Sequence, residues 1–105
     1  MPQRSDTRSY IYAIGTDTRQ KIGFSKDPAS RLKQLQTGNS EELQLHHAIS
    51  VNCDDVSLLE RHIHKDIGYK RVKGEWFDMS KQQAIDYLIF AEITWASDCN
   101  MRYKL

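Results

Sequence analysis

The chain has 105 residues, a hydrophobic content of 39% and a formal net charge of +1. This length predicts one domain with one modest core, and the near-neutral charge gives no reason by itself to expect nucleic-acid binding. Cys53 and Cys99 stand far apart with no CxxC partner, so we expect reduced thiols and neither a zinc site nor a disulfide framework. No signal peptide or membrane span is expected, which predicts a soluble cytoplasmic protein.

The first predicted unit is an antiparallel hairpin. Residues 1–8 are polar, and we expect a disordered tail there. Residues 10–14 are mostly β-branched or aromatic and predict a strand. Residues 15–18 have turn chemistry, and residues 21–24 return to extended structure.

A helix is predicted after the hairpin. Ser25 or Asp27 can cap it, and Pro28 suits its first turn. Gly38 stops the helix and suits a left-handed terminal position. The apolar stripe of this helix consists of Ala29, Leu32 and Leu35.

A third strand and a second helix come next. Residues 43–51 predict the strand, although the alternation of apolar and polar residues is imperfect around His46 and His47. Asn52 or Asp54 can cap the helix, and Gly68 ends it. Its core positions at helical spacing are Val56, Leu59, Ile63 and Ile67.

The last part of the chain predicts a basic loop over residues 69–75 and a short extended segment over 76–79. Ser80 and Gln83 match a capping box that opens a C-terminal helix. Its stripe is Ala84, Ile85, Leu88, Ile89 and Ile93. Because Tyr87, Phe90 and Trp95 add apolar surface, this helix is either a homodimer or partner surface or a buried terminal helix.

Together these elements predict an α+β fold, with a small antiparallel sheet made of the hairpin and the third strand and flanked by helices. Residues 9–97 would form the single domain, and residues 98–105 a polar tail.

Glu60 and His64 are the first candidate site residues. They lie four positions apart, so they share one helix face, which borders the apolar stripe. A half-buried carboxylate there suits an ion ligand. The alternative is a solvated glutamate that pairs with Arg61 or His64.

Arg31 sits at the edge of its helix's apolar stripe, and its planar guanidinium matches phosphate oxygens. The alternative is a surface arginine near Asp27. Tyr10 and Tyr12 share a face of the first strand, where ordinary aromatic packing is the alternative to a chemical role. Lys21 alone would be a strand-edge charge.

Two stretches are locally basic although the whole chain is balanced. They predict contacts to a nucleic-acid backbone, and the alternative is an ordinary solvated lysine surface. The candidate contact residues are Lys26, Lys33, Lys70, Arg71 and Lys73.

The order of these residues resembles the GIY-YIG nuclease superfamily, and most closely its compact phage-type branch, often described as a bacteriophage DNA-binding domain. That order is Tyr-x-Tyr, Lys-Ile-Gly, an arginine on the following helix and then a helical glutamate. The resemblance extends from about Tyr10 to Met79. Its recurring segments correspond to residues 21–25, 31–39, 59–64 and 74–77.

The resemblance assigns the hairpin residues. Ile11 and Tyr12 match the Ile-Tyr of the first motif, and Tyr10 replaces the glycine before it. Lys21 stands where many members carry the tyrosine of the second motif, while the following Ile22–Gly23 agrees. A cation that holds phosphate thus replaces a phenol that polarises water.

The resemblance also assigns the helices. Arg31 matches the family's helical arginine, Glu60 its metal-binding glutamate, and His64 would orient Glu60 or act as a secondary ligand. The asparagine that many members carry late in the domain has no clear match, since Glu75 or Trp76 occupies that region. We expect Trp76 mainly to pack in the core, although it could stack on a base.

The implied activity is metal-assisted hydrolysis of DNA phosphodiester bonds, with Mg²⁺ or Mn²⁺ held by Glu60. Tyr12 would position or deprotonate the attacking water, with Lys21 and Arg31 supplying positive charge while gripping the phosphate. Low sequence specificity and a phage or bacterial host are implied. Two alternatives remain: a non-catalytic DNA-binding module, and a small phage-type interaction or inhibitor protein on the same fold.

Overall fold

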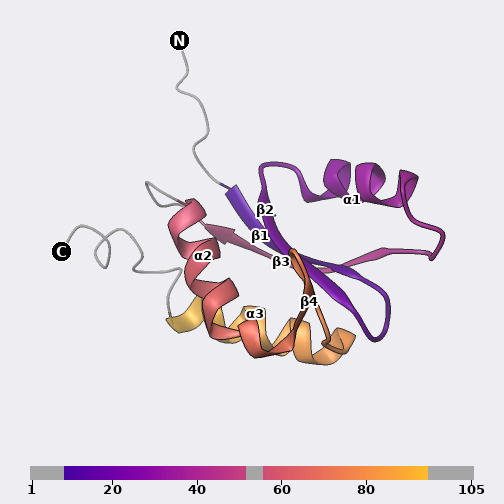
Figure 1. The fold of residues 1–105 in the computed structure, drawn as a ribbon. Helices are drawn as coiled ribbons and strands as arrows, with labels where there is room; N and C mark the ends of the chain where they lie inside the picture. The colour runs from indigo at the N-terminus through magenta and orange to yellow at the C-terminus, as the bar shows by residue number, and fades with distance from the viewer. Residues whose placement is uncertain (1–8, 52–55, 95–105) are drawn as a thin grey trace, which may run out of the picture.

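A computed structural model describes residues 9–51 and 56–94 of the chain. The predicted α+β class is confirmed, and the elements alternate around one sheet (Figure 1). In chain order they are β1 (Ser9–Gly15), β2 (Gln20–Ser25), α1 (Pro28–Thr37), β3 (Gln44–Val51), α2 (Val56–Asp66), the 3-10 helix η1 (Gly68–Lys70), β4 (Arg71–Lys73), β5 (Trp76–Phe77) and α3 (Lys81–Thr94).

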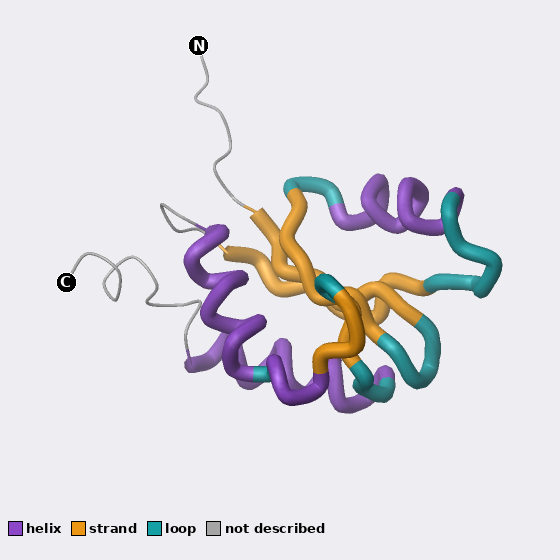
Figure 2. Tube along the Cα trace, in the orientation of Figure 1, coloured by secondary structure: helices purple, strands orange, loops and turns teal. Residues whose placement is uncertain are grey.

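Within the described residues, the sheet has five strands in the order β3-β1-β2-β5-β4, and every pairing is antiparallel. Figure 2 shows the strands at the centre of the molecule with helices on either side. The sheet is larger than predicted, because the hairpin and the third strand form only its first three strands. The prediction of a basic loop over residues 69–75 was wrong. That segment contains η1 and β4, and β4 uses β5 as its partner.

The imperfect alternation in the third strand has a structural cause. Ala13 pairs with His47 and Ile14 pairs with Leu45, so His46 is an extra residue in β3. Such a β-bulge interrupts the period of two without ending the strand. The Nε2 of His46 lies 2.9 Å from the Thr16 carbonyl oxygen, which ties the bulge to the hairpin turn.

The sheet is covered on both faces. Ile11 and Ala13 of β1 join the larger core, which α2 and α3 cover from one side. Tyr12 and Ile14 point the other way, into a smaller core under α1 that also receives Trp76. Because side chains alternate along a strand, a short hairpin supplies both cores, and the candidate site residue Tyr12 lies on the α1 side.

The predicted helix caps are partly confirmed. Asp27 caps α1, since its carboxylate accepts a hydrogen bond from the Ser30 backbone N–H at 3.2 Å. The capping box of Ser80 and Gln83 is confirmed by two reciprocal bonds of 2.9 and 3.0 Å. Gly38 ends α1 as predicted, but the left-handed conformation expected for it was wrong, since its φ is −98°. Among the described residues, the glycine with positive φ is Gly74, at +58°.

The predicted apolar stripe of α3 is only partly buried. Leu88 is fully buried, whereas Ile89 is 41% exposed and Ile93 is 73% exposed. The buried face consists of Ala84, Leu88 and Ala91, because small residues allow α3 to lie close to the sheet. Of the alternatives considered for this helix, the homodimer gains no support from the described residues.

Several predictions lie outside the described residues. They are the caps at Asn52 and Asp54, the state of Cys53 and Cys99, and the two terminal tails. Among the described helices, none has the length and apolar character needed to cross a membrane.

Candidate functional site

The hairpin brings Tyr12, Lys21 and Gly23 onto one face of the sheet. Tyr12 stands directly opposite Gly23, and Lys21 stands opposite Ile14. The Tyr12 side chain lies over Gly23, where an added Cβ would be 2.8 Å from the Tyr12 hydroxyl oxygen and 3.2 Å from Oε1 of Glu75. A phenol and a carboxylate therefore approach the same point above the strand, and only glycine leaves room for both.

Helix α1 supplies the guanidinium. The Nε of Arg31 donates to the Tyr12 hydroxyl at 3.3 Å, and its Nη1 donates to Oε1 of Gln34 at 3.0 Å. Arg31 is the first residue of α1 whose backbone N–H bonds within the helix ladder, to the Asp27 carbonyl at 3.1 Å. The cap at Asp27 thus fixes the start of α1 and, with it, the height of Arg31 above the sheet.

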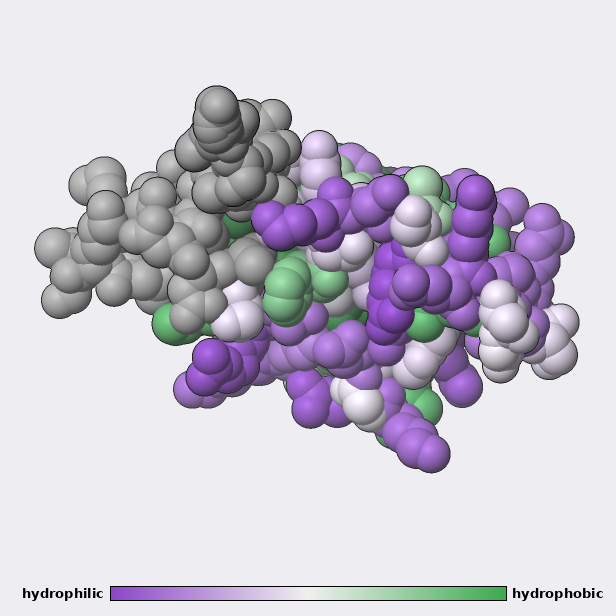
Figure 3. Space-filling model, turned by 90° about the horizontal axis from the view of Figure 1, so that it is seen from above, coloured by the Kyte–Doolittle hydropathy of each residue, from purple (hydrophilic) through white to green (hydrophobic). Residues whose placement is uncertain are grey.

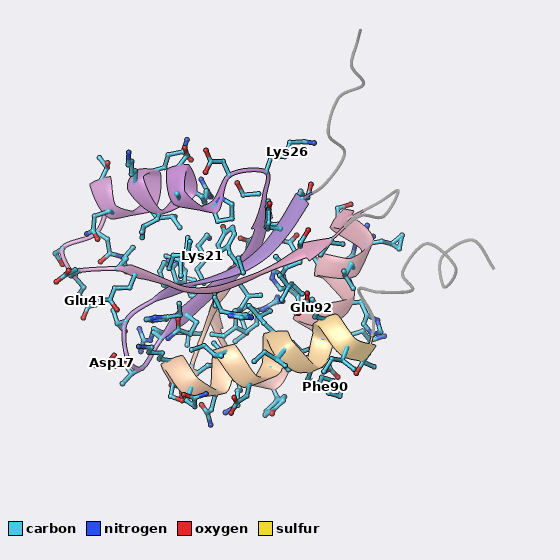
Figure 4. The ribbon with its side chains drawn as sticks, turned by 180° about the vertical axis from the view of Figure 1, so that it is seen from behind. Asp17, Lys21, Lys26, Glu41, Phe90 and Glu92 are labelled. Atoms are coloured by element: carbon cyan, nitrogen blue, oxygen red, sulfur yellow. The ribbon has the colours of Figure 1, made fainter. Side chains whose placement is uncertain are left out.

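Lys21 forms an ion pair with Glu75, at 3.2 Å between Nζ and Oε1. The Lys21 side chain is only 13% exposed. Its ammonium also lies 5.7 Å from the centroid of the Trp76 ring, which is its cross-strand neighbour. Figure 4 shows Lys21 in the space between α1 and the sheet.

Glu75 is held by the turn between β4 and β5. Gly74 turns the chain with its positive φ, and the Glu75 carbonyl then accepts the Ile22 N–H at 3.1 Å. This places the Glu75 side chain beside Lys21 and Gly23.

Helix α2 contributes Glu60 at the outer edge of β2. Strand β5 pairs only with Gln20 and Lys21, so the outward N–H of Phe24 lies beyond the ladder and donates to the Glu60 carboxylate. Burial, together with the charge of Glu75, raises the pKa of Glu60 to about 7. A carboxyl group with this pKa is poised to take up an ion or a proton near neutral pH.

The four groups expected to converge are Tyr12, Lys21, Arg31 and Glu60. Arg31 donates to the Tyr12 hydroxyl, and the charges of Arg31, Glu75 and Glu60 all act on the pKa of Tyr12. Lys21 pairs with Glu75, and its charge lowers the pKa of Glu60. Burial is the largest influence and raises the pKa of Tyr12, whereas the hydrogen bond and charge of Arg31 lower it. The positive charge expected to activate the phenol is therefore present, but burial outweighs it.

His64 makes a contact that differs from the secondary-ligand role considered for it. Its Nε2 lies 2.6 Å from the Ile22 carbonyl oxygen, and its ring lies 5.1 Å from the Phe77 ring, on the face covered by α2 and α3. Since a carbonyl only accepts, Nε2 carries the proton and is not free to ligate an ion. Tyr10 is half-buried and stands opposite Ser25, two residues from the cluster.

The predicted DNA-contact residues divide between two sides. The face that carries α1 is mainly hydrophilic (Figure 3), and Lys26 and Lys33 belong to this α1 region. Lys73 pairs with Trp76, whereas Arg71 pairs with Phe77 and lies 5.5 Å from that ring's centroid. The ammonium of Lys70 lies 5.5 Å from the Tyr69 ring. The bulge in β4 thus places Lys73 on the site's side and Arg71 on the opposite face.

The residues present fit a hydrated divalent cation. Glu60 and Glu75 are close enough for the charge of Glu75 to raise the pKa of Glu60, and a cation between them would relieve that repulsion. Mg²⁺ typically takes one or two carboxylates and keeps several waters. Within residues 9–51 and 56–94, no group of three or more His, Cys, Asp or Glu side chains is arranged to hold a metal ion.

Glu75 is the site residue that was not singled out from the sequence. It was visible only as part of the recurring segment 74–77, near the position of the missing asparagine. Its approach to Lys21 depends on the pairing of β5 with β2, which joins residues more than fifty positions apart.

These features define a small α+β domain with a charged cluster suited to phosphate. Residues 9–92 match the T5orf172 domain, and the chain belongs to that family. The family is phage-associated and is connected with nucleases and DNA binding. The resemblance is confirmed at this level, and the more specific placement among GIY-YIG nucleases stays a prediction. No curated protein and no solved structure matched the chain.

Proposed function

We propose that this protein is a metal-dependent endonuclease that hydrolyses phosphodiester bonds in DNA. What supports this activity is the convergence of a phenol, two cations and two carboxylates around Gly23, contributed by four elements and the β4–β5 turn. Membership of a DNA-associated family supports the choice of substrate.

The cations would bind the scissile phosphate. Arg31 uses one N–H group to bond Tyr12 and has further N–H groups in the same plane. This planar arrangement of donors suits phosphate oxygens. The Lys21 ammonium has three N–H donors, so it can maintain its ion pair with Glu75 and still donate to a phosphate. Both would stabilise the charge that develops on the phosphate during attack.

Tyr12 would orient the attacking water. Because burial raises its pKa, its phenol is neutral near pH 7 and acts as a hydrogen-bonding partner for water. A Mg²⁺ or Mn²⁺ ion held by Glu60, with Glu75 beside it, would stabilise the leaving oxygen. Glu60 must be ionised for this, which requires a pH near or above 7.

A non-catalytic DNA-binding module is the second candidate. The observation that favours it is the neutralisation of Lys21 by Glu75 together with the raised pKa of Tyr12. Such a module would still bind phosphate through Arg31 and the basic residues of α1.

The test is nicking of supercoiled plasmid with Mg²⁺ or Mn²⁺. We expect cleavage that falls at least about 100-fold in Glu60→Gln and in Arg31→Ala. Glu92→Gln, an exposed glutamate on α3, is the matched control and should keep full activity. DNA binding without cleavage under either ion would reject the enzyme and favour the binding module.

A further inference from the structure

A cavity of about 280 Å³ lies next to the charged cluster. It is formed by the β1–β2 turn, the loop between α1 and β3, and strands β4 and β5. The first two of these segments lie at the same end of the molecule (Figure 2), where Figure 4 labels Asp17 and Glu41. We propose that this cavity binds the base of an unpaired nucleotide next to the cleaved phosphate, an inference that rests on the proposed function.

The cavity offers a stacking surface. The indole of Trp76 lines it, together with Leu43 and Val72. Bases stack on aromatic side chains with little regard to sequence, because every base has a π-face. Val72 is 47% exposed, so this apolar lining reaches the mouth of the cavity.

The cavity also offers a donor and an acceptor. The Oδ1 of Asn39 accepts the Glu41 backbone N–H at 2.9 Å, which fixes the amide and leaves its NH₂ group as a donor. Glu41 brings an exposed carboxylate to the same wall. A base edge carries donors and acceptors side by side, and unpaired bases are read in this way.

Two cations border this apolar lining. Arg19 and Lys73 both line the cavity. Within the described parts of the chain, neither side chain has an ion pair or hydrogen bond. Two positive charges beside an aromatic wall suit a nucleotide, which combines a phosphate with a base.

The cavity shares Trp76 with the surroundings of the proposed site. Trp76 lines it, and the same ring lies 5.7 Å from the Lys21 ammonium. A phosphate held by Lys21 would therefore carry a neighbouring nucleotide to the mouth of the cavity. The volume is just below the range of cavities that hold drug-sized ligands, so it suits a single base.

Fluorescence of Trp76 tests the proposal directly. The chain has two tryptophans, so Trp95→Phe leaves Trp76 as the sole reporter. The probes are the four deoxynucleoside 5′-monophosphates, with deoxyribose 5-phosphate as the ligand without a base. We expect saturable quenching by the nucleotides and none by the sugar phosphate.

Val72→Glu places a negative charge at the mouth of the cavity and should weaken nucleotide binding at least about tenfold. Ile89→Glu is the matched control, since Ile89 is similarly exposed but lies on α3, across the sheet, and should leave binding unchanged. No quenching, equal quenching by the sugar phosphate, or equal effects of the two variants would overturn the proposal.

The result of the quenching test can be distinguished from the result of the plasmid-nicking test. Plasmid nicking without nucleotide-dependent quenching would reject the base cavity and leave the enzyme standing. Quenching that responds to Val72→Glu in a protein that never nicks DNA would support the cavity and reject catalysis.

Discussion

Gly23 is the position at which the site has the least free space. In Gly23→Ala the new Cβ would meet the Tyr12 hydroxyl at 2.8 Å, and Tyr12 is almost completely buried. The phenol must therefore shift, which we expect to cost about 1–3 kcal/mol of unfolding free energy. Displacement of the phenol should also lower plasmid nicking about 100-fold. Urea unfolding and nicking rates measure the two effects.

Gly68→Ala is the control for that change. No atom lies within 4 Å of the Cβ that it would add. We expect its stability to stay within about 0.5 kcal/mol of the parent and its activity to be unchanged. Full nicking activity in Gly23→Ala would contradict the view that Tyr12 must lie over this glycine.

Glu75 contributes to the ionisation of Glu60. Burial is the largest of the causes that raise the pKa of Glu60 to about 7, and the negative charge of Glu75 is the second. Glu75→Gln removes that charge, so the pKa of Glu60 should fall and its ionised form should persist at lower pH. The acidic limb of the pH–rate profile should therefore move to lower pH, by about 0.5–1 pH unit.

The same variant releases Lys21 from its ion pair, which would raise affinity for phosphate. The pH–rate profile of plasmid nicking separates the two effects, because a change in affinity alone leaves the position of the limb unchanged at saturating DNA. Glu92→Gln should leave the profile in place. A limb that moves to higher pH in Glu75→Gln would contradict the proposed coupling.

At the scale of elements, His64 holds α2 against β2. Its Nε2 donates to the Ile22 carbonyl at 2.6 Å, and Glu60 lies one turn earlier on the same helix. His64→Ala leaves that carbonyl unpaired, which we expect to cost about 1–3 kcal/mol of unfolding free energy. The half-saturating Mg²⁺ concentration for nicking should rise, because Glu60 is no longer held in place.

His64→Gln supplies an N–H donor again and should restore part of both losses. Lys65→Ala, an exposed position on the same helix, should change neither quantity. Loss of stability with an unchanged Mg²⁺ requirement would show that His64 supports the fold but does not position Glu60.

The elements show what a single sequence can predict. The hairpin, the cap at Asp27 and the box at Ser80 were predictable, because each depends on residues close together in the chain. Strand β4 was not, since its three residues are exposed and extend only because β5 pairs with them. The sequence also could not predict that Ala91 is buried and Ile93 exposed, because the angle at which α3 packs against the sheet determines which residues are buried.

In the candidate site, too, features that depend on long-range contacts could not be predicted from the sequence. Tyr12, Arg31 and Glu60 were predicted from motif positions, and the structure places them together. Glu75 was missed because it reaches Lys21 through long-range strand pairing. The ligand role considered for His64 differs from its observed contact, since position on a helix cannot show which backbone carbonyl a side chain will meet.

At the scale of the whole molecule, the two faces of the sheet have different partners. One face is closed by α2 and α3 over the larger core. The other carries the charged cluster, the cavity and α1. Under the proposed function, a phosphate backbone would approach the second face, so the effect of a basic residue on DNA binding should depend on the face on which it lies.

Lys73 and Arg71 test this division within one short strand. The bulge in β4 places Lys73 beside Trp76 and Arg71 over Phe77, on opposite faces. Because each lost phosphate contact lowers the salt dependence of binding, Lys73→Ala should reduce the slope of log K against log [salt] by about 1. Arg71→Ala should leave that slope unchanged, and fluorescence anisotropy with labelled DNA at several salt concentrations measures both. Equal slopes in the two variants, or a loss confined to Arg71→Ala, would mean that DNA does not approach from the α1 side.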